Sequence, residues 1–324
     1  MNLINHILLF LFSLGVVWFF AGILIDSVDR VAKRFNKTGF TVAFFVLGFL
    51  TSISEISVAV NSSFENQPQI SAGNLIGASF VIMLLIVPFL AVASKGIALK
   101  KLISDKNLIF ALGVIALPSF FVLDGRVTRL EGIFILLLYA ALVVSIHKKE
   151  SILPTLESVD ESLLHKKHPA LKDLFKILIG AAVIFLAGHV LVTEGVYFSG
   201  LLNVPSSIVG LLLLGIGTNM PELVIAIRSI YKKHTDIAFG DYLGSAVANT
   251  PVFAVLVLQQ GAFSVEPTEF VPTFFLMMGG LIMFYFFAKS DRRISRTEGW
   301  ILLYVYFAFL VVQTANFLNL SNKL

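Results

Sequence analysis

Two short stretches of the sequence decide the fold: LTSISE at residues 50–55 and GTNMPE at residues 217–222. Each places a glutamate, Glu55 or Glu222, near the middle of a long apolar segment. The chain around them has 324 residues, of which 57% are hydrophobic and only 14% are charged. An average soluble domain has roughly 25% charged residues. The composition therefore excludes a soluble enzyme and predicts an integral membrane protein.

The apolar segments have the length of membrane-spanning helices, each of which needs about 20 predominantly apolar residues. We predict ten spans, at residues 4–25, 40–63, 71–94, 107–124, 130–147, 174–194, 207–228, 237–259, 269–288 and 299–318. The loops between them leave no room for a separate soluble domain. The predicted fold class is an all-α membrane protein.

The basic residues are concentrated in alternate loops. Of the 24 Lys and Arg residues, 21 lie after the odd-numbered spans. Because cytoplasmic loops are enriched in Lys and Arg, we expect a multi-pass protein of the cell membrane with basic loops in the cytoplasm and both termini outside. The net charge of +4 then reflects the orientation of the chain in the membrane. No nucleic-acid partner is expected.

The chain contains an internal repeat, which a shift of 167 positions reveals. Residues 40–90 align with 207–257 without a gap, and ten of the 51 pairs are identical. The identical pairs include glycines, one threonine and the two glutamates of the stretches quoted above.

Each half contains five predicted spans, so the second half enters the membrane from the opposite side. Inverted repeats of this kind are a common construction of secondary transporters, whose ion sites lie near the midplane between the repeats. We predict a first repeat at residues 1–149, a cytoplasmic linker at 150–172 and a second, inverted repeat at 173–324.

The second and seventh spans are predicted to be broken helices. Pro221 lacks the backbone N–H that would continue span 7. Ser54 occupies the position in span 2 that matches Pro221. Ser and Thr side chains can form hydrogen bonds with the preceding turn of the backbone and bend the helix. Carbonyl groups freed at membrane depth are tolerated where they line a cavity.

The two glutamates are the candidate ligands of a cation. An ionisable group at membrane depth costs several kcal/mol unless it is paired or hydrated, and no Lys or Arg lies in the central part of any predicted span. Two bidentate carboxylates and the backbone carbonyls near Thr51 and Thr218 would supply about six oxygens, which meets the 6–8 that Ca²⁺ takes.

Further polar residues lie near the glutamates in the sequence. Ser245 and Asn249 are four residues apart, so they share one face of span 8 and can point at the carboxylates or form interhelical hydrogen bonds. Span 3 has Ala78 and Ile82 at the matching positions. Asp241 is interpreted as a charge at the start of span 8, favoured there by the helix dipole.

These residues resemble the alpha repeats of the sodium/calcium exchanger family, whose pattern is GTSLPE followed by GNxxGSN in each half. The second copy matches well, at residues 217–222 and 240–246, and the first copy is eroded, at 50–55 and 73–79. The resemblance implies alternating-access exchange of Ca²⁺ for Na⁺, with Ca²⁺ on the two glutamates and the threonine carbonyls. The short linker indicates a minimal, prokaryotic type.

The residues and the resemblance together predict an antiporter that is not an enzyme, works as a monomer in the lipid bilayer, carries Ca²⁺ and Na⁺ and holds no cofactor. The predicted ion-binding residues are Glu55, Glu222, Thr51, Thr218, Ser52, Asn219, Ser245 and Asn249.

Three alternatives remain open at this point. Ala78 and Ile82 remove two oxygen donors, so fewer Na⁺ ions bind, or protons on the two glutamates replace some of them in a Ca²⁺/H⁺ exchanger. The eroded first copy also fits a degenerate, non-transporting relative. An intramembrane metalloprotease would need the motif His-Glu-x-x-His, which the sequence lacks.

Overall fold

A computed structural model describes residues 2–32, 44, 48–99, 103–149, 170–220, 222, 223, 226, 227, 230 and 235–321. The helices of the first half are α1 (Leu3–Ala32), α3 (Gly48–Thr51), α4 (Ile53–Phe64), α5 (Pro68–Val81), the π-helix η3 (Ile82–Ile86), α6 (Val87–Ala93), α7 (Asp105–Phe121) and α8 (Arg129–Lys149). Those of the second half are α10 (Ala170–Leu202), α11 (Ser206–Val209), the π-helix η5 (Gly210–Leu214), α12 (Gly215–Thr218), α14 (Thr235–Gln260), α15 (Pro267–Ser290) and α16 (Arg296–Ser321).

The all-helical membrane fold predicted from the sequence is confirmed, since every predicted span coincides with helical residues in the described part of the chain. Seven of these helices are long and apolar enough to cross a membrane. Of the remaining spans, α7 has 17 residues, and spans 2 and 7 are each broken into shorter helices. The predicted linker lies mostly outside the described residues, between α8 and α10.

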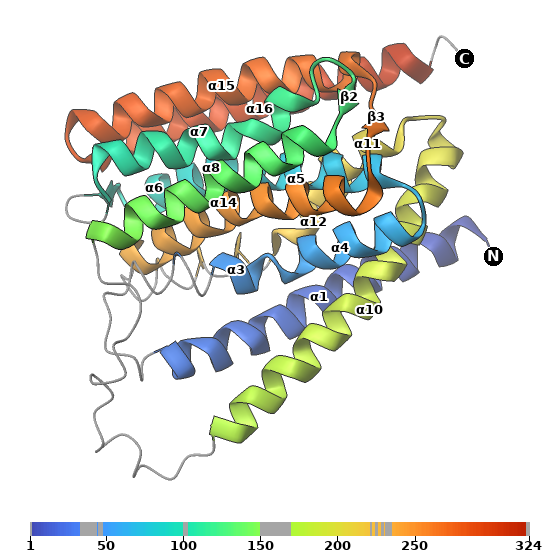
Figure 1. Ribbon diagram of the computed structural model, residues 1–324, viewed down its shortest axis with the longest axis horizontal. Coiled ribbons are helices and arrows are strands. Elements are labelled where there is room, and N and C mark those ends of the chain that lie inside the picture. Colours follow the sequence, from blue (N-terminus) through green and yellow to red (C-terminus); the bar gives the residue numbers. More distant parts are fainter. Residues whose placement is uncertain are drawn as a thin grey trace.

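Spans 3 and 8 form the centre of the molecule (Figure 1). Buried residues make up 83% of the apolar window of span 3 and 78% of that of span 8, but only 17% of that of α1. Each central span packs on the broken helix of the opposite repeat: α14 contacts α3 and α4, and α5 contacts α11, η5 and α12. The two repeats are therefore interlocked rather than side by side.

Glycines make these crossings close. A side chain at Gly244 would overlap the backbone of Phe44, and one at Gly77 would overlap the backbone of Leu211. The shift of 167 positions that aligns the repeats pairs Gly77 with Gly244 and Phe44 with Leu211. The two contacts are therefore equivalent in the two repeats. These glycines thus allow the close approach of helices that small residues give in membrane proteins.

The helices α1 and α10 lie against each other along one face of the molecule (Figure 1). They pack on α4 through an apolar cluster that is separate from the main core, with Phe10 on α1, Val58 on α4 and Leu191 on α10. Nδ1 of His6 on α1 lies 2.7 Å from a carboxylate oxygen of Glu194 on α10, within hydrogen-bond distance. This pair of helices therefore forms a layer of its own over the broken helix of span 2.

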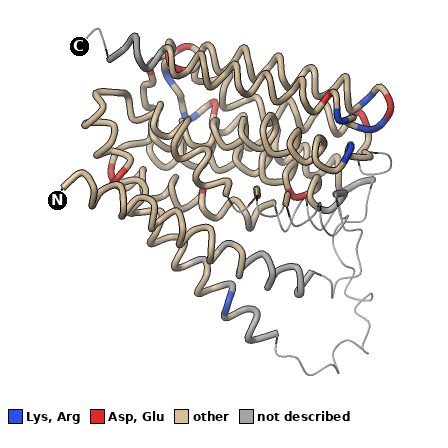
Figure 2. The backbone as a smooth tube through the Cα atoms, turned by 180° about the vertical axis from the view of Figure 1, so that it is seen from behind, with Lys and Arg blue, Asp and Glu red and all other residues tan. Residues whose placement is uncertain are grey.

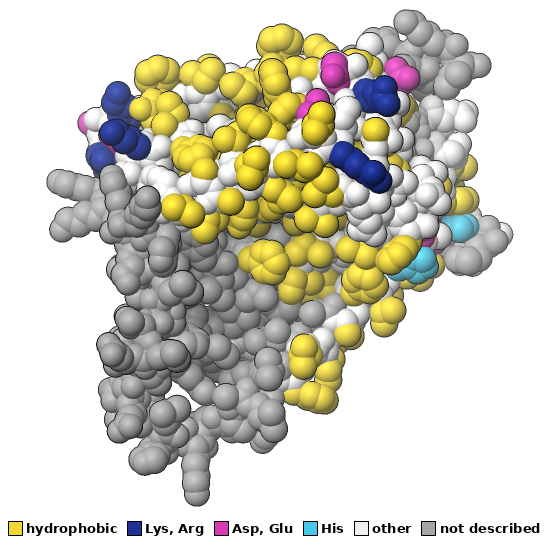
Figure 3. Space-filling model, in the orientation of Figure 1, with side chains coloured by type: hydrophobic (Ala, Val, Ile, Leu, Met, Phe, Trp, Pro, Cys, Tyr) yellow, Lys and Arg dark blue, Asp and Glu magenta, His cyan; other side chains and the backbone are white. Residues whose placement is uncertain are grey.

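Two short ladders tie loops together at the two ends of the bundle. The strands β1 (Ile97–Ala98) and β4 (Arg293–Ile294) pair at one end, and β2 (Arg126–Val127) and β3 (Phe263–Ser264) pair at the other. Each ladder joins loops that the charge pattern assigns to the same side of the membrane. Most described charged residues lie near the two ends (Figure 2), with a hydrophobic surface between them (Figure 3).

The glycine crossings predict a large effect of a single methyl group. Gly244→Ala is expected to destabilise the protein by ~1–3 kcal/mol, the usual effect of overpacking, because the methyl overlaps the backbone of Phe44. Thermal unfolding in detergent measures the change. Gly279→Ala on α15 is the control, since no atom lies within 4 Å of its added methyl. Equal stability of the two variants would contradict the packing argument.

Candidate ion-binding site

The break in span 2 occurs at Ser52, between α3 and α4. Its backbone angles are φ −74° and ψ 6°, and the helix resumes at Ile53. The hydroxyl of Ser52 donates to the carbonyl of Gly48 over 2.9 Å, which is the back-bonding that bends helices. The predicted break is confirmed, and the hydroxyl of Ser52 forms a hydrogen bond with one backbone carbonyl at the break.

The break in span 7 repeats this geometry at Asn219. Helix α12 ends at Thr218, and Asn219 has φ −90° and ψ 10°. The side-chain amide of Asn219 donates to the carbonyl of Gly215 over 2.6 Å. Asn219 and Gly215 are the partners of Ser52 and Gly48 in the repeat alignment, so both breaks use the same contact. Pro221, to which the break was attributed, lies outside the described residues.

Glu55 and Glu222 are each only 1% exposed. One carboxylate oxygen of Glu55 lies 2.8 Å from the hydroxyl of Ser54, which is also 3.3 Å from the carbonyl oxygen of Thr218. Ser54 therefore brings a glutamate of the first repeat to the helix break of the second. The other oxygen of Glu55 and both carboxylate oxygens of Glu222 make no hydrogen bond of good geometry, although the side chains of Thr218 and Thr51 are close enough to interact with the two carboxylates.

The two threonines join the repeats through their side chains. The hydroxyl of Thr218 lies 3.3 Å from the side-chain oxygen of Asn74 on α5. The hydroxyl of Thr51 lies 3.4 Å from a carboxylate oxygen of Asp241 on α14. Asn74 and Asp241 are alignment partners, so the two contacts are related by the repeat.

Ser245 and Asn249 both make interhelical hydrogen bonds. The hydroxyl of Ser245 lies 2.5 Å from that of Thr51 and 3.1 Å from the carbonyl oxygen of Gly48. The amide of Asn249 donates to Ser79 over 3.2 Å, and its side-chain oxygen has no partner. Ser245 thus lies beside the break in span 2, whereas Asn249 lies where spans 3 and 8 meet and keeps one free acceptor.

Sequence reasoning missed Asp241. It is fully buried, and α14 already begins at Thr235. A helix dipole acts within the first turn, so the interpretation of Asp241 as a helix-start charge is wrong. Its alignment with Asn74, which takes part in the site, was the signal that could have found it.

The buried carboxylates lack basic partners. In the described part of the chain, none of the ion pairs involves Glu55, Glu222 or Asp241. Glu222 interacts electrostatically with both other acids. Even so, no three Asp, Glu or His side chains among the described residues are placed to share one metal ion. An ion held by the two glutamates would therefore need backbone carbonyls as well.

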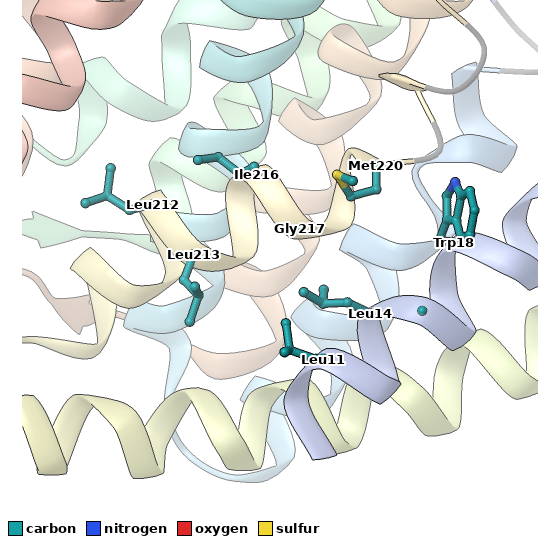
Figure 4. A pocket seen from close by; sticks show the side chains of 9 residues that line it. Leu11, Leu14, Trp18, Leu212, Leu213, Ile216, Gly217 and Met220 are labelled. Atoms are coloured by element: carbon teal, nitrogen blue, oxygen red, sulfur yellow. The ribbon is translucent and has the colours of Figure 1, made fainter. Parts of the chain in front are cut away.

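An apolar pocket of about 360 Å³ lies beside the broken helix (Figure 4). Leu11, Leu14 and Trp18 of α1 face Ile216 and Met220 across it. Its lining is apolar apart from the indole N–H of Trp18, so these side chains offer no charged or oxygen ligand to a cation.

Comparisons with known proteins identify the family. Residues 5–147 and 173–315 each match the sequence model described as "Sodium/calcium exchanger protein". The chain belongs to the sodium/calcium exchanger protein family. Its two matched segments correspond to the two repeats, and the family is one of membrane transporters.

The chain is 31% identical over 144 residues to the sodium/calcium exchanger MaX1 of Methanosarcina acetivorans, a match that covers 44% of this chain and 40% of that protein. It is 26% identical over 299 residues to an uncharacterized membrane protein of Methanocaldococcus jannaschii, covering 92% and 93% of the two chains. The fold matches that of the sodium-calcium exchanger NCX_Mj with a TM-score of 0.69 and 20% identity, over 96% of this chain and 99% of that one.

The two buried glutamates predict stabilisation by a divalent cation. A ligand at a hundredfold excess over its Kd stabilises the folded state by about 2.7 kcal/mol, so Ca²⁺ is expected to raise the unfolding temperature in detergent. Glu55→Gln and Glu222→Gln should abolish this rise because each removes a ligand charge. Glu269→Gln, which alters a buried carboxylate on α15, is the control and should keep it. A full Ca²⁺ effect in both glutamate variants would exclude this site.

Proposed function

We propose that the protein is a secondary active antiporter that exchanges Ca²⁺ for a monovalent cation by alternating access, with Na⁺ as the expected counter-ion. The observation that carries the proposal is the pair of buried glutamates beside the two helix breaks. Three of their four carboxylate oxygens make no hydrogen bond of good geometry. Membership in the sodium/calcium exchanger protein family and the name of the relative MaX1 support the choice of ions.

The ligand chemistry favours a divalent cation between the two repeats. The carboxylates of Glu55 and Glu222 carry two negative charges, which one Ca²⁺ balances. The carbonyl oxygens of Thr51 and Thr218 each lie 3.3 Å from the hydroxyl of Ser54, which is the hydrogen-bond partner of Glu55. Carboxylates and carbonyls are the oxygen ligands that Ca²⁺ takes.

Proton coupling is the second candidate. It is favoured by Ala78 and Ile82, which are fully buried and apolar at the positions where span 8 carries Ser245 and Asn249. With fewer neutral oxygens on the side of span 3, fewer Na⁺ ions are expected to bind. Protons on the two glutamates would then take the place of the missing ions.

Proteoliposomes test the exchange and its counter-ion. Uptake of ⁴⁵Ca²⁺ is expected when the vesicles are loaded with Na⁺ and diluted into Na⁺-free medium, because outward Na⁺ movement drives Ca²⁺ inward. Uptake driven by an outward proton gradient alone would favour Ca²⁺/H⁺ exchange. Glu222→Ala should abolish either flux, since the site loses half of its carboxylate charge. If the wild type and the variant both show only the background leak of the vesicles, the protein is a non-transporting relative.

We also propose that both termini lie outside the cell and that the basic loops lie in the cytoplasm. The chain has no cysteine, so a single introduced thiol can be labelled without removing others. A membrane-impermeant maleimide added to intact cells is expected to label Arg126→Cys, near the ladder of β2 and β3. Lys95→Cys, at the other end of the bundle beside β1, is the matched control and should react only after permeabilisation. The reverse labelling pattern would invert the orientation.

A further inference from the structure

One end of the bundle carries a cluster of positive charge (Figure 2). At this end β1 pairs with β4, so the loop after span 3 lies against the turn between α15 and α16. The described charged residues of these two segments and of the helix ends beside them are Lys95, Lys106, Lys289, Arg292, Arg293 and Arg296, with the acids Asp105, Asp291 and Glu298. Cations therefore outnumber acids in this part of the described structure.

Two of these cations have structural partners within the loops. The guanidinium of Arg292 donates to the carbonyl of Ile103 over 3.2 Å and lies 2.7 Å from a carboxylate oxygen of Asp105. The guanidinium of Arg293 donates to the carbonyl of Lys95. Both arginines therefore hold the loop after span 3 against the turn between α15 and α16.

Lys289 and Arg296 flank the same turn and have no such role. Both side chains are exposed, and none of the ion pairs in the described part of the chain involves either of them. Lys289 lies in the last turn of α15, where the helix dipole favours a cation. Arg296 is the first residue of α16, where the dipole disfavours one, so helix stability does not explain its charge. The guanidinium and the positive end of α16 together favour an anion from outside the protein.

Aromatic rings lie one helical turn further into the membrane from each of these two cations. Nζ of Lys289 lies 5.8 Å from the centre of the Tyr285 ring. On α16, Trp300 follows Arg296 by four residues and Tyr304 follows by eight, so the three share one face of the helix. Trp300 is 44% exposed and Tyr304 is 68% exposed. Trp and Tyr gather where lipid headgroups meet acyl chains, and Lys and Arg extend their charges from apolar surface toward the headgroups.

The opposite end of the bundle lacks this combination. Around β2 and β3, the two described cations are Arg126 and Arg129. The described acids of the same segments outnumber them: Asp124, Glu131, Glu266 and Glu269. An anion is therefore favoured at the end where β1 pairs with β4, and not at the end where β2 pairs with β3.

We propose that the turn between α15 and α16 binds an anionic phospholipid, with Lys289 and Arg296 at its headgroup and Trp300 and Tyr304 along its acyl chains. Clusters of Lys and Arg directly beside membrane-spanning helices bind anionic headgroups in this way. A phospholipid matches both parts of the surface, whereas a free phosphate ion would use the cations and leave the exposed rings without a partner. The assignment does not depend on the proposed exchange or on the orientation of the chain.

The test is thermal unfolding of the purified full-length protein in detergent while lipid is added to the micelles. Dioleoyl phosphatidylglycerol should raise the unfolding temperature and saturate, because a ligand of the folded state stabilises it. Dioleoyl phosphatidylcholine, which has the same chains and no net charge, should give no saturable rise. Inorganic phosphate at the same concentration should also give none.

Charge-neutral variants locate the site. Lys289→Gln and Arg296→Gln should each weaken the apparent affinity for phosphatidylglycerol about fivefold, and the double variant about thirtyfold, which is the usual contribution of cations beside an anionic lipid. The double variant Arg126→Gln, Arg129→Gln is the matched control, since it removes the same charge from the opposite end. Its affinity should equal that of the wild type. All four side chains are exposed, so both double variants should unfold at the wild-type temperature when no lipid is present.

Three results would overturn the proposal. An equal loss of affinity in the two double variants would show a response to net charge and not to this turn. An equal rise with phosphatidylcholine would show a general effect of lipid, and the same rise with inorganic phosphate would assign the cations to a free anion.

Discussion

The structure depends on how polar groups are satisfied at two helix breaks in the middle of an apolar bundle. Each break leaves backbone carbonyls without their helical partners. Ser52 and Asn219 satisfy one carbonyl each through the same side-chain contact, which stabilises both breaks. The carboxylates of Glu55 and Glu222 next to them are not satisfied in this way, and this imbalance is the basis of the cation site that we propose at the centre of the bundle.

The interlocking of the repeats follows from the same constraint. A broken helix exposes its backbone, so it has to be covered by a helix that approaches closely. Gly77 and Gly244 allow this approach on the two sides, and spans 3 and 8 become the most buried of the long helices. The broken helix of one half is therefore completed by the central span of the other, and neither half encloses the site alone.

The two halves have diverged in the oxygens that they present. Span 8 offers Asp241, Ser245 and Asn249, whereas the matching residues of span 3 are Asn74, Ala78 and Ile82. The two halves of the repeat therefore present unequal sets of oxygen atoms to the centre of the bundle. The buried charge and the additional polar side chains thus lie on α14, whereas the matching positions of span 3 are neutral or apolar.

The sequence by itself determined the membrane fold, the repeat and its offset, and the two glutamates, because apolar length, charge spacing and a carboxylate in an apolar run are local properties. The sequence also predicts a break in span 7, from Pro221, and the structure places the end of α12 at Thr218 and Asn219. Only the tertiary structure decided what contacts what. It placed Ser54 between Glu55 and the carbonyl of Thr218, and it turned Asp241 from a helix-start charge into a buried acid beside Thr51. These contacts join residues more than 160 positions apart, so they arise from the crossing of helices, which no local pattern encodes.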